Sequence, residues 1–157
     1  HLYMIETITN CPGEVLYERK REDQKMLNQD TCLVLSQLLT STFNDTFSTY
    51  LQATMAGYQL DNINACKTGS TDVDNLAVAY NPEVLVASWV GYDDNRKMTT
   101  TNDKTVAKKT VVDVLQYTNE IKEVNWYQPT SSLQQIAINP LTGENDENGL
   151  VYWFKKE

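Results

Sequence analysis

The chain has 157 residues, 41% of them hydrophobic and 22% charged, which is typical of one soluble globular domain. Its formal net charge of −8 and the lack of basic patches interleaved with aromatic residues argue against nucleic acid as a partner. No uninterrupted apolar run reaches membrane-spanning length.

The three cysteines, Cys11, Cys32 and Cys66, are odd in number and have no C-x-x-C spacing. The sequence therefore supports neither a zinc site nor a disulfide framework, and we expect no metal and no cofactor. Cys32 lies within a helical pattern, which favours a small buried side chain there. His1 is the only histidine, so a Ser-His-Asp or Cys-His triad would depend on the first residue and is not favoured.

The first elements are predicted to be a pair of strands. Residues 2–9 and 14–20 are rich in β-branched and aromatic residues, and N-C-P-G at 10–13 is turn chemistry. A charged loop follows at 19–25. The chain starts without an initiator methionine or a signal peptide, so we expect it to be an internal piece of a longer protein.

Two helices are predicted next. Either Asn28 or Asp30 can cap the first, whose apolar stripe is predicted at Leu35, Leu38, Leu39 and Phe43. A shorter helix is predicted over 46–56 and would end at Gly57.

A β-rich run follows, with strands predicted at 66–73, 75–80 and 84–92. The short Asn81-Pro82 turn makes the last two antiparallel neighbours. Adjacent carboxylates at 93–94 suggest acid–base chemistry, but a solvated turn is the favoured interpretation at the end of a strand.

The longest helix is predicted at 103–120, with one apolar stripe at Val106, Thr110, Val111, Val114, Leu115 and Ile121. Packing on the chain's own sheet is favoured over binding a partner. Residues 126–157 form a different region, with a last short strand predicted at 151–154. Its acidic run at 144–149 is rejected as a calcium loop, because Lys155 takes the position of the bidentate glutamate.

The K-T-G-S-T stretch at 67–71 is the candidate site. On a strand, Thr68 and Ser70 point to one face, while Lys67, Gly69 and Thr71 point to the other. Two hydroxyls beside an ammonium form a receptor for a carboxylate, and Gly69 allows close approach. Four residues are a weak match alone, since an ordinary solvated strand lysine would look the same.

Several further motifs follow in a fixed order: D-N-L-A-V-A-Y-N-P at 74–82, W-V-G-Y-D-D at 89–94, W-Y-Q-P at 126–129, N-P-L-T-G at 139–143 and Y-W-F at 152–154. Together with K-T-G they resemble the C-terminal half of the transpeptidase domain of class A penicillin-binding proteins, the bifunctional peptidoglycan synthases. Two departures stand out. Cys66 replaces a usual glycine, and Leu76-Ala77 replace a bulky aromatic pair.

The resemblance implies an α+β fold of the β-lactamase/D,D-transpeptidase type, C-terminal portion only, with antiparallel strands carrying K-T-G-S and packed by helices. Residues 1–125 would be the C-terminal part of the transpeptidase domain and 126–157 a C-terminal extension. Lys67 and Ser70 would be catalytic, the first through its positive potential and the second through a backbone N–H in the oxyanion hole. Thr68, Gly69, Ser70 and Thr71 would bind the substrate, with the Thr68 and Ser70 hydroxyls on the terminal carboxylate of a D-alanyl-D-alanine stem peptide or a β-lactam.

The sequence contains no S-x-x-K and no S-x-N, which in this family supply the nucleophile and a proton-relay serine. The chain alone is therefore expected to be an inactive part of a serine-type acyltransferase. The resemblance places the parent on the extracytoplasmic face of the bacterial membrane, anchored by a segment absent from this chain, with a glycosyltransferase domain upstream.

Two other functions stay open. The chain could be a non-catalytic module that binds wall peptide or a partner protein, or a β-lactam hydrolase of the same fold, although the 126–157 extension favours a synthase. We also expect self-association through an uncovered sheet edge or apolar face.

Overall fold

A computed structural model describes residues 4–20, 25–44, 52–121, 124–126 and 128–156. Within these residues the chain is α+β, with three separate antiparallel sheets and two α-helices. The predicted α+β class with antiparallel strands is confirmed. The expectations that concern His1, Tyr127 and residues 46–51 fall outside the described residues.

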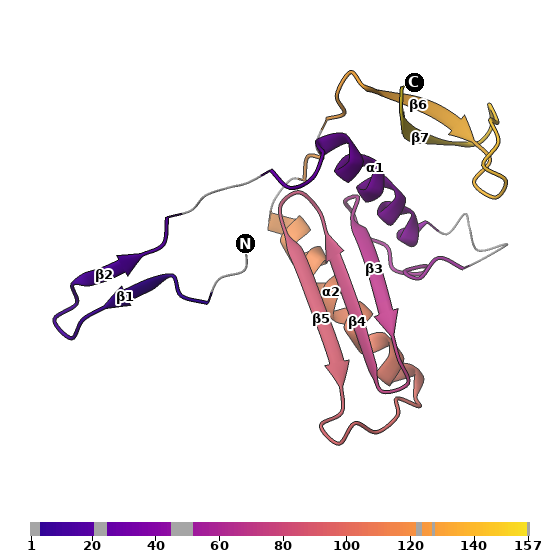
Figure 1. Cartoon of the computed structure of the whole chain (residues 1–157). Helices are drawn as coiled ribbons and strands as arrows, with labels where there is room; N and C mark the ends of the chain where they lie inside the picture. The colour runs from indigo at the N-terminus through magenta and orange to yellow at the C-terminus, as the bar shows by residue number, and fades with distance from the viewer. Residues whose placement is uncertain (1–3, 21–24, 45–51, 122–123, 127, 157) are drawn as a thin grey trace.

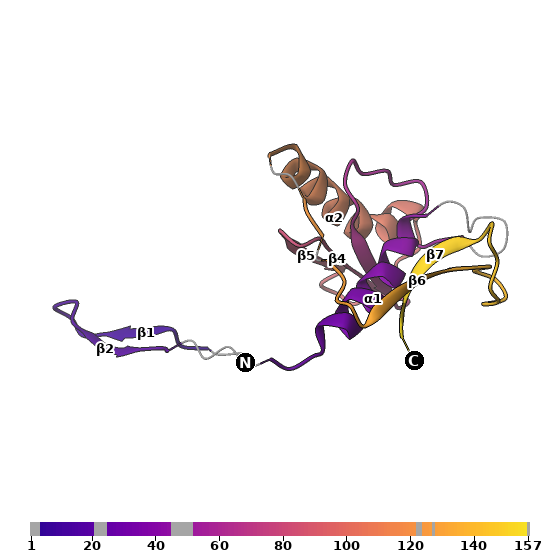
Figure 2. The same cartoon turned by 90° about the horizontal axis from the view of Figure 1, so that it is seen from above.

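The first sheet is the hairpin of β1 (Thr7–Thr9) and β2 (Val15–Glu18), so the predicted strand pair is confirmed in a shorter form. In the turn of this hairpin, Gly13 has a φ of +90°. The side-chain oxygen of Asn10 accepts a 2.8 Å hydrogen bond from the Glu14 amide. The hairpin projects away from the remaining elements, and both strands are exposed throughout (Figures 1 and 2).

Helix α1 (Gln29–Thr40) is capped by Asn28, whose side chain accepts from the backbone amides of Asp30 and Thr31. A short 3-10 helix, η1 (Ser41–Phe43), continues it. The predicted apolar stripe was wrong in part, since Leu35 and Leu38 are each 54% exposed. The burial predicted for Cys32 was also wrong, because this side chain is exposed.

Residues 54–57 form a turn and residues 52–53 are irregular, which corrects the helix predicted over 46–56 for its described portion. The Ala56 amide donates to the Ala53 carbonyl, and Gly57 has a φ of +85°. The turn inserts the fully buried Met55 into the hydrophobic core, and the Met55 amide donates to the Thr42 carbonyl. This segment therefore contributes a buried side chain to the core from a turn and not from a helix.

The central sheet consists of β3 (Ala65–Ser70), β4 (Asp74–Tyr80) and β5 (Leu85–Gly91), in that spatial order and antiparallel throughout. The predicted pairing of the last two strands is confirmed. The turn between them depends on the buried Asn81, whose side-chain oxygen accepts from the amides of Glu83 and Val84.

Helix α2 (Thr101–Ile121) lies along one face of this sheet (Figure 1). Reciprocal hydrogen bonds between Thr100 and Asp103 satisfy its first amides, which is the geometry of a capping box. The predicted stripe is confirmed for Val111 and Leu115, which are fully buried, but it was wrong for Thr110, which is exposed, and for Val114, which is 40% exposed. The residues of α2 that are buried against the sheet are Ala107, Val111 and Leu115, which recur at four-residue steps.

The third sheet pairs β6 (Leu133–Ile138) with β7 (Leu150–Lys155). The last strand was predicted, whereas β6 was missed. The Gln37 side chain on α1 holds β7 through a 2.7 Å bond from the Trp153 amide and a 3.1 Å bond to the Val151 carbonyl. The carboxylate of Asp30 also accepts from the hydroxyls of Thr130 and Ser132, so α1 connects this sheet to the rest of the fold.

Candidate functional site

Strand β3 presents the K-T-G-S residues on two different faces of the sheet. Cys66, Thr68 and Ser70 alternate on the face that α2 covers, opposite Ala79, Ala77 and Asn75 of β4. Burial decreases along this row, from the fully buried Cys66 through the half-buried Thr68 to the exposed Ser70. The hydroxyl-bearing end of the strand therefore opens to solvent beside α2.

A cavity of about 340 Å³ lies at this end, between β3 and the first half of α2. Its β3 wall consists of Thr68, Gly69, Ser70 and Thr71, and its other walls include Lys104, Lys108 and Thr54. Four of the five predicted site residues therefore surround one cavity.

Lys67 does not line this cavity. Its exposed ammonium donates a 2.6 Å hydrogen bond to the carbonyl oxygen of Thr68, and its side chain belongs to the opposite face of the sheet. The two residues expected to be catalytic, Lys67 and Ser70, are thus neighbours along the strand but are directed to different faces.

Thr71 fixes the turn that follows β3. Its hydroxyl donates to the Asp74 carboxylate at 2.8 Å and accepts from the amides of Val73 and Asp74. These bonds hold the end of β3 beside the start of β4. The Thr71 hydroxyl therefore forms its hydrogen bonds within the turn, unlike the other described hydroxyls of the cavity wall.

Cys66 lies next to the site but is not suited to nucleophilic chemistry. Burial raises the pKa of its thiol to about 11, and the ammonium groups of Lys108 and Lys67 only partly oppose this shift. Because the thiolate is the reactive form, a thiol with this pKa stays protonated and inert near neutral pH. Cys66 acts as a small core side chain packed with Met55 and Ala79.

Sequence reasoning missed the two lysines that α2 contributes. Lys104 and Lys108 are one helical turn apart, on either side of the core residue Ala107. The Lys108 ammonium donates a 2.7 Å hydrogen bond to the Thr54 carbonyl. Their spacing on a predicted helix was visible, but the face against which they would lie was not.

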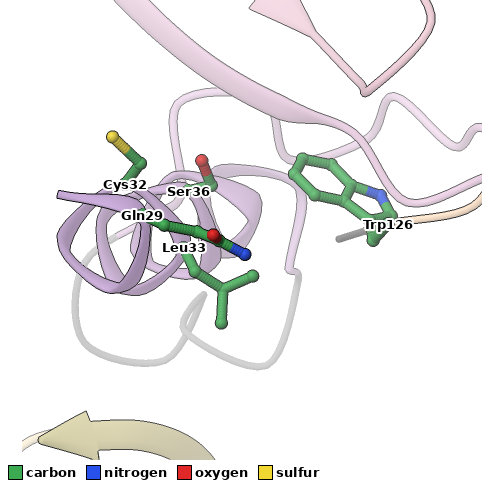
Figure 3. Close-up of a pocket in the computed structure, with 5 residues that line it drawn as sticks. All are labelled: Gln29, Cys32, Leu33, Ser36 and Trp126. Atoms are coloured by element: carbon green, nitrogen blue, oxygen red, sulfur yellow. The ribbon is translucent and has the colours of Figure 1, made fainter. Parts of the chain in front are cut away.

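A second cavity of about 340 Å³ lies between α1 and Trp126, where Figure 3 shows the indole facing Gln29, Leu33 and Ser36 across the gap. The indole N–H of Trp126 donates to the Ile63 carbonyl at 2.9 Å. Among the described residues that line it, only Cys32 has a titratable side chain, so this cavity offers less chemistry than the one beside β3.

The adjacent carboxylates at 93–94 lie in an exposed turn, as predicted. Asp94 pairs with Arg96 at 3.5 Å, and the Arg96 guanidinium stacks 3.8 Å from the centre of the Tyr92 ring. Among the described residues, no group of three or more histidine, cysteine or acidic side chains is arranged to hold a metal ion.

No protein-family model matches the chain. Penicillin-binding protein 2D of Bacillus subtilis (strain 168) is 24% identical over 147 residues, which cover 92% of this chain and 21% of that protein. The crystal structure of penicillin-binding protein 1A from Haemophilus influenzae superposes with a TM-score of 0.72 at 14% identity, over 99% of this chain and 29% of that one. The chain is thus similar in sequence to one penicillin-binding protein and in fold to another.

The chain spans about a fifth of the length of the Bacillus penicillin-binding protein. Its fold is similar to that of part of a penicillin-binding protein, which confirms the resemblance to this family. None of the helices in the described ranges combines the length and the apolar character needed to cross a bilayer.

Proposed function

We propose that the chain forms one wall of the active site of a serine-type D,D-transpeptidase, which cross-links peptidoglycan stem peptides through an acyl-enzyme. The observation that carries the proposal is the cavity beside β3, into which the Thr68 and Ser70 residues face. Two hydroxyls at alternate positions of an edge strand can hold a peptide carboxylate, while the strand binds the peptide backbone. A β-lactam carboxylate would occupy the same place.

In this reaction, Lys67 supplies positive potential from the other side of β3, and the backbone N–H of Ser70 is one of two oxyanion donors. Loss of one such donor typically costs about 2.7–4 kcal/mol of transition-state stabilisation. The nucleophile would come from an S-x-x-K motif, which this sequence lacks. The chain alone therefore binds ligand without forming an acyl-enzyme.

The test has a binding arm and a covalent arm. Diacetyl-L-lysyl-D-alanyl-D-alanine is titrated into the 157-residue chain and followed by NMR, and a fluorescent penicillin is used as a covalent probe. We expect reversible peptide binding, weakened by Thr68→Val and Ser70→Ala, and no covalent labelling. Thr110→Val, which removes an exposed hydroxyl on α2, is the matched control. Stoichiometric labelling of this chain, or variants at β3 that bind like the control, would contradict the proposal.

A non-catalytic binding module is the second candidate, favoured by the lack of S-x-x-K and S-x-N in these residues. It predicts the same peptide binding. The two functions differ in the complete gene product, which is acylated by penicillin only if it is a transpeptidase.

We also propose that the chain functions outside the bacterial cell membrane, where peptidoglycan is cross-linked, and that it self-associates when isolated. The face of the central sheet opposite α2 exposes Leu76, Leu85 and Trp89 by 41%, 67% and 65%. Apolar area of this kind favours association. In sedimentation velocity we expect a dimer or larger species that Trp89→Ser shifts toward monomer, and a monomeric wild-type chain would refute the association.

A further inference from the structure

The cavity beside β3 is basic, although the chain as a whole carries a net charge of −8. Two lysines, Lys104 and Lys108, contribute to its lining, and none of the described lining residues is an aspartate or glutamate. An anion entering this space would therefore meet two positive charges without a competing carboxylate from the described part of the wall.

The acidic groups that flank the cavity are engaged elsewhere. Asp72 pairs with Lys97 at 3.0 Å, and Asp74 accepts from the Thr71 hydroxyl. Asp103, one residue before Lys104, accepts from the Thr100 amide and from the Tyr92 hydroxyl. Within the described residues, neither cavity lysine forms an ion pair.

The two lysines differ in how they are held. The Lys108 ammonium is positioned by its bond to the Thr54 carbonyl, which leaves two of its three N–H groups for a ligand. The side chain of Lys104 forms no hydrogen bond with the described part of the chain and is exposed at the cavity rim. One ammonium is thus fixed, and the other can move toward an incoming anion.

We propose that Lys104 and Lys108 bind the carboxylate of the ligand together with the hydroxyls of Thr68 and Ser70. This inference rests on the proposed function and adds two positive charges on α2 to the potential that Lys67 supplies from the other side of β3. A carboxylate has about four lone-pair positions, which matches two hydroxyl and two ammonium donors. Charge-assisted hydrogen bonds of this kind are about twice as strong as neutral ones.

Lys104→Met is the main test, because it removes the charge without breaking any hydrogen bond within the described residues. Lys109→Met is the matched control, since it removes the same charge from the next turn of α2 but lies outside the cavity lining. We expect Lys104→Met to weaken binding of diacetyl-L-lysyl-D-alanyl-D-alanine about tenfold, as for the loss of one charged hydrogen bond. Lys109→Met should leave the affinity unchanged.

A peptide with a C-terminal amide separates charge recognition from a general effect on folding. Its affinity should be weaker in the wild type and insensitive to Lys104→Met. Lys108→Met should weaken carboxylate binding as well, with hydrogen exchange at residues 52–57 used to check that the turn at Thr54 persists.

The outcomes separate this inference from the proposed function. If Lys104→Met binds like Lys109→Met while Thr68→Val and Ser70→Ala lose affinity, the role of α2 is refuted and the β3 cradle stands. If the β3 variants also bind like the wild type, the proposed function itself is wrong. Inorganic phosphate that competes as strongly as the peptide would reduce the cavity to a general anion site and overturn the assignment to a peptide carboxylate.

Discussion

The two faces of the central sheet have the same strands and alternation, but α2 covers one face, whereas at the β5 edge the other face is largely exposed. On the face covered by α2, Cys66, Ala77 and Ala79 are fully buried, whereas on the other face Leu85 and Trp89 are 67% and 65% exposed. At these positions the buried side chains are small and the exposed ones are large. Small residues let the helix approach closely, so side-chain volume, more than hydrophobicity, marks the face on which α2 packs.

Truncating a leucine is expected to give the largest difference in unfolding free energy between the two faces. Leu115→Ala removes a fully buried side chain of α2 and should lower the free energy of unfolding by about 2–5 kcal/mol. Leu85→Ala removes the same atoms from the open face and should change it by less than about 0.5 kcal/mol. Urea denaturation of both variants measures the difference. Similar losses would mean that the open face is covered in solution.

Enlarging an alanine tests the same contrast in the opposite direction. Ala77→Leu overpacks the contact with α2 and should cost about 1–3 kcal/mol of unfolding free energy. Ala87→Leu places the same side chain on the exposed face of β5 and should be nearly neutral. If Ala77→Leu were equally neutral, α2 would not be held closely against β4.

The arrangement around β3 was predictable because its signals are local. Alternation placed Thr68 and Ser70 on one face, and turn residues such as Asn81 fixed the antiparallel neighbours. The choice of which face α2 covers was not local. Lys104 and Lys108 reach the cavity through packing between segments more than thirty residues apart, which no short pattern encodes.

The predictions that were wrong, for β6 and for the apolar stripes of the two helices, also failed because they depend on tertiary contacts. Gln134 and Gln135 interrupt the alternation of β6, which is defined by its pairing with β7. The predicted stripe of α2 omitted Ala107, because this small residue was not counted as a core position. Leu35 and Leu38 fit a helical period but are each 54% exposed. Tertiary contact decides which of several apolar positions is buried.

The reactivity of the three cysteines distinguishes the buried face beneath α2 from exposed positions. Cys66 is fully buried beneath α2, and burial raises the pKa of its thiol to about 11, whereas Cys11 and Cys32 are exposed. At pH 8, iodoacetamide should modify Cys11 and Cys32 quickly and leave Cys66 unmodified until the chain is denatured. Mass spectrometry of the peptides measures this. Rapid native labelling of Cys66 would show that the α2 face opens readily.

The smallest effect concerns the start of α2, where Asp103 fastens the helix to the sheet. The hydrogen bonds from the Thr100 amide and then from the Tyr92 hydroxyl lower the pKa of the Asp103 carboxyl below its ordinary value of 3.8. Because the folded state favours the carboxylate, this contribution to stability is fully present above pH 3.8 and is lost as the pH falls through the lower folded pKa.

Asp103→Asn removes that titration, so its free energy of unfolding should depend less steeply on pH below 4 than that of the wild type. Asp113→Asn, at an exposed position of the same helix, is the matched control and should keep the wild-type slope. Denaturation midpoints between pH 2.5 and 5 measure both slopes. Equal slopes for the two variants would mean that the helix is held to the sheet by its buried stripe alone, with no contribution from the carboxylate at its first turn.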